Sequence, residues 1–168
     1  RHRNPVVGLK DVNFYFTEEK RPVVNQKFLG ASANNSFADI TIIIDRKQSM
    51  KVYESQINSS VRELASCMDP RTTFRIVSAG QIPALEYVGS PNGAKQFSVA
   101  GLKTGYANNV PMDLAVRLAA NDLINAEKKR AIIFISDGDI TQNSFDKYSL
   151  NEMTSYLNNN FISFLMIQ

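Results

Sequence analysis

The chain has 168 residues, which is enough for a single domain with a sizeable apolar core. Hydrophobic residues make up 43% of it and charged residues 21%, as in an ordinary globular protein. The net charge of +3 is mild and comes from scattered Lys and Arg, so we expect no binding to nucleic acid. No apolar run is long enough to span a membrane, so we expect no direct membrane insertion. The single cysteine, Cys67, excludes a disulfide bond within the chain.

Residues 1–36 are predicted to form a short β extension followed by a linker. Residues 12–16 (VNFYF) are mostly strand-forming residue types, and a second extended piece begins at residue 22. Residues 29–36 (LGASANNS) are small and polar, which is typical of a linker. The remainder, residues 37–168, is predicted to be the main domain.

The main domain is predicted to begin with a strand and a helix. Residues 40–45 form a short apolar run that ends in an aspartate, and such a run is typical of a strand buried on both faces. Residues 52–68 have a helical period that gathers their apolar side chains on one face. Cys67 lies in this helix, and its surroundings predict a buried structural thiol.

A hairpin and a turn are predicted next. Residues 72–78 and 84–88 have the composition of two strands that pair antiparallel at one edge of the sheet. Residues 89–93 (GSPNG) combine Gly, Ser, Pro and Asn, which is a turn signal.

The rest of the chain alternates helix and strand. A proline in the first position starts a helix over residues 111–126, and a strand follows over residues 131–136. Ser149 and Glu152 form a capping box at the start of the final helix, and residues 161–167 have the composition of another buried strand. This alternation predicts an α/β fold: a doubly wound, mostly parallel central sheet flanked by helices.

Two of these strands end abruptly in an aspartate. Residues 38–50 (ADITIIIDRKQSM) contain Asp45, and residues 131–138 (AIIFISDG) contain Asp137. The carboxyl ends of parallel strands lie at one edge of the sheet, where open α/β sheets have their functional crevice. We therefore expect the two carboxylates to meet at that edge.

This pattern resembles the von Willebrand factor type A (vWA) family over about residues 38–168. In that family the first strand ends in Asp-x-Ser-x-Ser, a later loop supplies a Thr, and the fourth strand ends in an Asp. Together these residues form the metal-ion-dependent adhesion site (MIDAS), where one divalent cation also takes a carboxylate from the protein ligand. The resemblance matches Asp45, Ser49 and Asp137 to this site. It places Lys47 where the family has a Ser, and Val110 where it has the Thr.

The two departures change the chemistry expected of the site. Mg²⁺ requires oxygen ligands in a near-octahedral arrangement, and of the hydroxyls that bind it directly in the family only Ser49 remains. The Lys47 ammonium has no lone pair and repels a dication. We therefore expect no cofactor, and a vestigial metal site in which Lys47 replaces the cation and pairs with Asp45 and Asp137.

Two alternatives stay open at this point. In the first, Lys47 points to solvent and the metal site has simply decayed. In the second, the loop is aligned differently, and Asn108, Asn109 or Thr104 supplies the missing ligands so that Mg²⁺ binds.

The resemblance implies a non-enzymatic protein-protein interaction module of the adhesion type. The sequence contains no phosphate-binding loop and no histidine-based system for activating a nucleophile, so we do not expect an enzyme. The expected partner is another protein or a neighbouring domain of the same polypeptide. The alternative function is a structural scaffold domain of a larger protein or assembly, with an inert former metal face. The residues predicted to form the interaction face are Arg46, Lys47, Lys51, Asn108, Asn109 and Asp139.

The resemblance also predicts a truncated domain and a location. An A domain normally continues past its fifth strand with a helix and often another strand, so the last strand is expected to expose apolar surface unless something covers it. Residues 8–23 resemble the segment that precedes the A domain in many bacterial exported proteins. This favours an extracytoplasmic location, in the bacterial periplasm or on the cell surface.

Overall fold

The computed structural model describes residues 15, 17–23, 38–126, 128–141 and 143–168.

The chain divides into two units, Arg1–Ser36 and Phe37–Gln168. In the first unit, strands β1 (Thr17–Glu18) and β2 (Arg21–Pro22) pair antiparallel. The two residues between them both have positive φ, which is the geometry of a tight type I′ hairpin turn. Apart from Tyr15, the strand predicted at residues 12–16 and the predicted linker lie outside the described residues.

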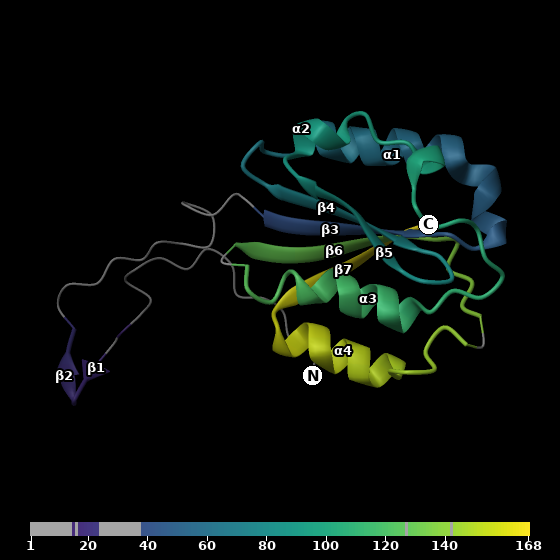
Figure 1. Ribbon diagram of the computed structural model, residues 1–168. Helices are drawn as coiled ribbons and strands as arrows, with labels where there is room; N and C mark the ends of the chain where they lie inside the picture. The colour runs from purple at the N-terminus through teal and green to yellow at the C-terminus, as the bar shows by residue number, and fades with distance from the viewer. Residues whose placement is uncertain (1–14, 16, 24–37, 127, 142) are drawn as a thin grey trace. The chain divides into compact units, whose positions relative to one another are not determined.

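The described residues of the second unit form a five-stranded sheet in the order β5-β4-β3-β6-β7 (Figure 1). Four of these strands run parallel, and β5 pairs antiparallel with β4 at one edge. This confirms the predicted α/β fold with its antiparallel edge hairpin. The strands are β3 (Ala38–Asp45), β4 (Thr73–Ala79), β5 (Ala84–Gly89), β6 (Lys129–Ile135) and β7 (Ile162–Ile167).

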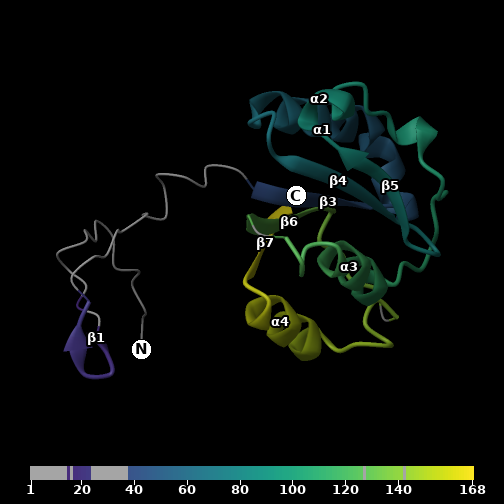
Figure 2. The same cartoon turned by 60° about the vertical axis from the view of Figure 1, so that its left-hand side comes forward.

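Helices cover both faces of this sheet (Figure 2), with α1 and α2 on one side and α3 and α4 on the other. Because both faces are covered, the side chains of β3 from Asp39 to Asp45 are all buried: Ile42 and Ile44 face α1, and Ile43 faces α3. The helices are α1 (Glu54–Cys67), α2 (Pro91–Ala94), α3 (Met112–Asn121) and α4 (Leu150–Asn159), with 3₁₀ turns at Gln48–Tyr53 and Val99–Gly101. No helix among the described residues is long and apolar enough to cross a membrane.

Several predicted boundaries differ from the structure. The helix predicted over residues 111–126 ends at Asn121, and the turn predicted over residues 89–93 overlaps the short helix α2, which ends at Ala94. The prediction that Cys67 is buried was wrong, because its side chain is exposed. Ile57, Val61 and Ala65 form the buried stripe of α1, and Cys67 is two positions, about 200°, past Ala65 on the helix.

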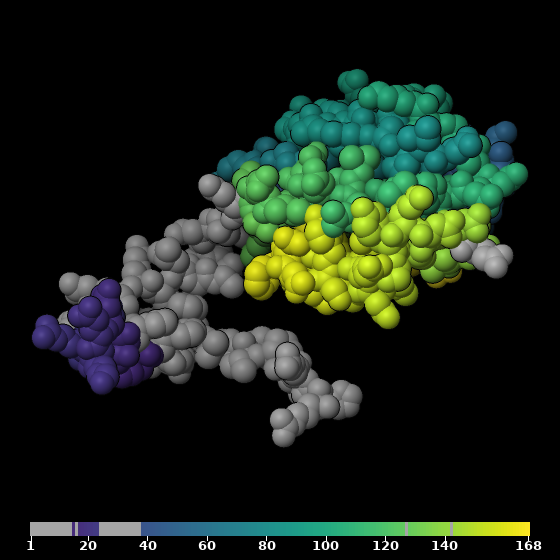
Figure 3. Space-filling model, turned by 60° about the horizontal axis from the view of Figure 1, so that its bottom comes forward, coloured from purple at the N-terminus to yellow at the C-terminus, as the bar shows by residue number. Residues whose placement is uncertain are grey.

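Strand β7 is much more exposed than its apolar sequence predicted. Of its residues only Ile162 is buried, and the four from Phe164 to Ile167 are all at least 38% exposed. The reason is its position at the edge of the sheet, where the described residues leave much of both faces open. An apolar groove of about 730 Å³ lies between β6, β7, α3 and α4. Figure 3 turns the side of the molecule that carries α4 toward the viewer.

The N-terminal cap of α4 gives a direct test of the local structure. The hydroxyl of Ser149 accepts the N–H of Glu152 at 3.3 Å, and the Glu152 carboxylate accepts the N–H of Ser149 at 2.8 Å. Ser149→Ala is expected to lower the free energy of unfolding by about 1 kcal/mol, measured by urea denaturation. Ser155→Ala, an exposed serine within the same helix, is the matched control and should change it by less than about 0.5 kcal/mol. Equal losses in the two variants would contradict the capping role.

Candidate functional site

The carboxyl ends of β3 and β6 lie side by side in the middle of the sheet. The two strands are parallel neighbours, with Ile44 paired to Ile135. After β3 the chain continues to β4 on one side, whereas β6 lies on the other side, so a topological switch point falls between β3 and β6. Such a point is where open α/β sheets have a crevice. Asp45 ends β3 and Asp137 follows β6, so both predicted carboxylates reach this edge.

The side chain of Lys47 lies between these carboxylates. Its Nζ is 2.6 Å from Oδ1 of Asp137 and 3.4 Å from Oδ2 of Asp45, and it also donates to the main-chain carbonyl of Asp139. Only 4% of the side chain is exposed. An ammonium has three N–H donors, and three acceptors surround this one. Burial would lower the pKa of Lys47, but the hydrogen bond to Asp137 and the two negative charges raise it above its usual 10.5.

Asp45 is completely buried and is held by hydrogen bonds from two loops. Its Oδ1 accepts the main-chain N–H of Lys47 at 2.9 Å, and its Oδ2 accepts the hydroxyl of Ser136 at 2.7 Å. Burial raises the pKa of Asp45 above 3.8, and the bonds from Ser136 and Lys47 oppose this only in part. Ser136 was missed in the sequence, where its only signal is a hydroxyl directly before Asp137.

Asp137 is more exposed than Asp45, and hydrogen bonds connect it to the loop that follows β3. Its Oδ2 accepts the hydroxyl of Ser49 at 2.6 Å, and its Oδ1 accepts the N–H of Asp139 at 3.0 Å in addition to Lys47. Burial alone would raise the pKa of Asp137, but these hydrogen bonds, led by Lys47 and Ser49, lower it to about 2. Asp45, Ser49 and Asp137 thus lie together at this edge.

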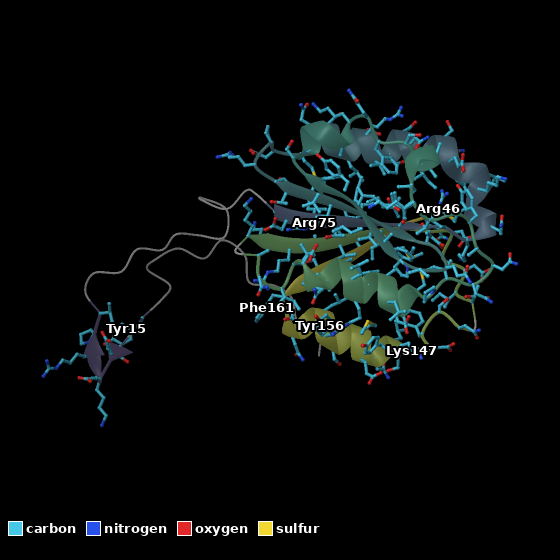
Figure 4. The ribbon with its side chains drawn as sticks, in the orientation of Figure 1. Tyr15, Arg46, Arg75, Lys147, Tyr156 and Phe161 are labelled. Carbon is cyan, nitrogen blue, oxygen red and sulfur yellow. The ribbon has the colours of Figure 1, made fainter. Side chains whose placement is uncertain are left out.

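Arg46 does not lie on the surface, so its predicted place on an exposed interaction face was wrong (Figure 4). Its guanidinium carbon is 3.7 Å from the centre of the Tyr106 ring, and its Nε donates to the carbonyl of Thr104 at 3.2 Å. Tyr106 in turn donates to Glu54 at 2.6 Å, and burial together with this bond raises the pKa of Tyr106 to about 12. The period of β3 continued to residue 46 would have placed Arg46 on the α1 face, with Ile44.

Main-chain hydrogen bonds connect the loop before α3 to the loop that follows β3. The N–H of Ala107 donates to the carbonyl of Arg46 at 2.8 Å, and the N–H of Gln48 donates to the carbonyl of Ala107 at 3.1 Å. Val110 is 1% exposed and packs in the apolar cluster beneath α3. Among the predicted interaction residues, Lys51, Asn108, Asn109 and Asp139 are exposed. Within the described part of the chain, no group of three or more His, Cys, Asp or Glu side chains is arranged to hold a metal ion.

Comparison with known proteins identifies the fold. No family model and no curated protein matches this sequence. Among solved structures, proximal thread matrix protein 1 from the mussel byssus, with a zinc-occupied MIDAS motif, matches at 13% identity and a TM-score of 0.64, covering 79% of this chain and 35% of that one. BatB, a conserved hypothetical protein of Bacteroides thetaiotaomicron, matches at 18% identity and a TM-score of 0.59, covering 77% and 65%. The ArnB paralog VWA2 of Sulfolobus acidocaldarius matches at 20% identity and a TM-score of 0.56, covering 79% and 41%.

The matched region spans less than two thirds of each of these three chains. At such low identities the similarity establishes the fold, which is vWA-like. The structural neighbours of this chain are vWA-domain proteins.

The hydrogen bonds to Asp137 predict an acid-dependent loss of stability. Because its pKa is about 2 in the folded protein and ordinarily 3.8, its charge stabilises the fold fully above pH 4. This contribution is lost as the pH falls through 2. We expect the free energy of unfolding of wild type to exceed that of Asp137→Asn by about 1 kcal/mol at pH 6, allowing for the partial exposure of Asp137. The difference should shrink steadily below pH 4 in urea denaturation.

Asp45 is present in both of these proteins, and its pKa is raised chiefly by burial, with the charge of Asp137 the smallest of the causes, so most of its contribution cancels from the comparison. Asp146→Asn, at an exposed aspartate in another loop, is the control. A difference between wild type and Asp137→Asn that stays constant from pH 6 to pH 2 would show that the charge of Asp137 is not held by Lys47 and Ser49.

Proposed function

We propose that the vWA-like unit binds another protein through the loops at the carboxyl edge of its sheet, without catalysis and without a divalent cation. Domains of the vWA type mediate protein interactions and are typically non-catalytic. The observation that carries the metal-independent part of the proposal is the buried Lys47 ammonium, which has Asp45 and Asp137 as its counter-ions. A location outside the bacterial cytoplasm stays a prediction.

The side chains at this edge do not suit a hard divalent cation. Lys47, charged and with its Nζ 2.6 Å from Asp137, contributes positive charge and no lone pair at the centre of the site. Val110 presents an apolar side chain where the family resemblance implies a hydroxyl, and it is buried against α3. Of the three hydroxyl positions that the family resemblance implies, Ser49 alone keeps a hydroxyl of the kind that Mg²⁺ takes directly. We infer that the ammonium takes the place of the metal and neutralises much of the same negative charge.

This arrangement also changes what the face can recognise. The Lys47 side chain is 4% exposed, and its ammonium donates two hydrogen bonds inside the protein and forms an ion pair with Asp45, so it is not available to bind a carboxylate from a partner. Arg46 is buried against Tyr106, which leaves Lys51 as the exposed cation among the three that the sequence placed here. Recognition then depends on shape, on hydrogen bonds from Asn108 and Asn109, and on exposed apolar side chains of the same loops. Those apolar side chains are Val52, Tyr53 and Ile140.

A scaffold function is the second candidate, and one observation favours it. The side chains of β7 are exposed and line an apolar groove, a surface that a neighbouring structural element would bury favourably. In that case the loop edge is inert and the domain serves to hold other parts of a larger assembly.

Thermal unfolding in the presence of Mg²⁺, Mn²⁺ or Ca²⁺ tests the replacement of the metal by lysine. A ligand that binds only the native state raises the melting temperature, so we expect no metal-dependent rise in wild type. Lys47→Ser combined with Val110→Thr restores the hydroxyl ligands, and this double variant should be stabilised by Mg²⁺ or Mn²⁺. Lys51→Ser with Val110→Thr is the matched control, because it removes a neighbouring lysine but leaves Lys47 in place. Stabilisation of wild type at sub-millimolar metal would overturn the proposal.

Photo-crosslinking tests the interaction face itself. Benzoylphenylalanine at Asn108, in the organism that encodes the chain, is expected to capture a separate protein, and EDTA should not reduce the yield. The same residue at Asn125, exposed beyond the end of α3 at the opposite edge of the sheet, is the position control. Crosslinks from Asn108 only to other parts of the same polypeptide would favour the scaffold function. An EDTA-sensitive crosslink would contradict metal-independent binding.

A further inference from the structure

The turn that carries Asp137 is held from two directions. The loop that follows β3 lies on one side of it, here called the inner side, and the end of β7 lies on the other, the outer side. On the inner side, Lys47 and Ser49 donate to the Asp137 carboxylate, each at 2.6 Å. On the outer side, the side-chain amide of Gln168, directly after β7, donates to the main-chain carbonyl of Asp137 at 2.9 Å. The turn is therefore fixed between its ion pair and the edge strand.

Gly138 brings the main chain of this turn against β7. Its φ of +80° is a conformation that glycine adopts readily. A Cβ at this position would lie 3.1 Å from Cε of Met166, which is closer than ordinary contact, and 3.4 Å from Nε2 of Gln168. The side chains of Met166 and Gln168 thus lie directly over the residue that follows Asp137.

The part of β7 that makes these contacts is exposed, and no described residue covers it. Met166 is 48% exposed and lines the apolar groove together with Gly138 and Ile140. Leu165 is 55% exposed, and its side chain points to the other face of the sheet because successive residues of a strand alternate. Met166 therefore lines the groove and also lies beside the turn at Gly138.

We propose that Gln168 and Met166 are positioning residues for Asp137, and that β7 thereby controls how firmly Lys47 is paired. This inference rests on the proposed function, in which the Lys47 ammonium is the internal counter-ion of the interaction face. In this arrangement a contact with the edge strand β7 changes the structure of the interaction face at the carboxyl ends of the strands. Contacts that move Met166 or Gln168 shift the Asp137 turn, and the shift reaches Lys47 through its hydrogen bonds to the Asp137 carboxylate and to the main-chain carbonyl of Asp139.

The reactivity of the Lys47 amine measures this coupling. The chain is treated with limiting N-hydroxysuccinimide acetate, and acetylation of Lys47 and of the exposed Lys51 is followed over time by peptide mass spectrometry. In wild type, Lys47 should react much more slowly than Lys51, because its amine is buried and its pKa is raised. In Gln168→Met, which keeps the length of the side chain but loses the donor, Lys47 should react about two- to fivefold faster than in wild type.

Met166→Ala is the second test variant and should accelerate Lys47 in the same direction. Leu165→Ala is the matched control, since it removes an equally exposed apolar side chain from the opposite face of the same strand. Its Lys47 rate should stay at the wild-type value, and Lys51 should react equally in all four proteins. Melting temperatures show whether each variant remains folded.

The outcomes separate this inference from the proposed function. If Lys47 reacts as fast as Lys51 in wild type, the internal ammonium does not exist and the proposed function fails. If wild-type Lys47 is protected but neither Gln168→Met nor Met166→Ala accelerates it beyond Leu165→Ala, the coupling to β7 is overturned and the proposed function stands.

Discussion

The completely buried carboxylate of Asp45 is the constraint on which the loop edge of this domain depends. A buried charge is unfavourable unless it is paired and hydrogen-bonded. Asp45 accepts hydrogen bonds from Ser136 and from the main chain of Lys47, and the Lys47 ammonium is its counter-ion. These groups come from the loop after β3 and from the end of β6. The hydrogen bonds and the ion pair of this one carboxylate therefore join the two loops and fix the position of Asp137. The raised pKa of Asp45 shows that desolvation remains the larger effect.

The consecutive cations Arg46 and Lys47 are both buried, but in different surroundings, and their burial removes two positive charges from the surface of the loops. Arg46 continues the period of β3 toward α1 and stacks on Tyr106, whereas Lys47 lies between the carboxylates. Among the predicted interaction residues, the exposed charges are those of Lys51 and Asp139. Burial of the other two cations keeps the loops close together.

The mostly parallel sheet with its antiparallel edge hairpin, and the meeting of Asp45 with Asp137, could be predicted from the sequence, because apolar runs ending in polar residues report burial and strand ends directly. The sequence could not show that Arg46 is buried, since its cover, Tyr106, comes from a loop sixty residues away with no periodic signal. Ser136 and Gln168 were missed for the same reason: single polar residues at strand ends acquire a role only through neighbours across the sheet. The exposure of β7 depends on what lies beside the sheet, and composition alone predicted burial.

Aspartates stand at both ends of the central strand. Asp39 is 5% exposed and bonds to Arg75 at 3.4 Å, toward the opposite end of the sheet from Arg46 (Figure 4). The residues between Asp39 and Asp45 are almost all Ile, so a shift of β3 by two positions would preserve which side chains face each layer of helices. Such a shift would also move one aspartate away from its partners and into the apolar interior. The two carboxylates therefore exclude the misaligned sheets that hydrophobic burial alone would accept, and so favour a single alignment during folding.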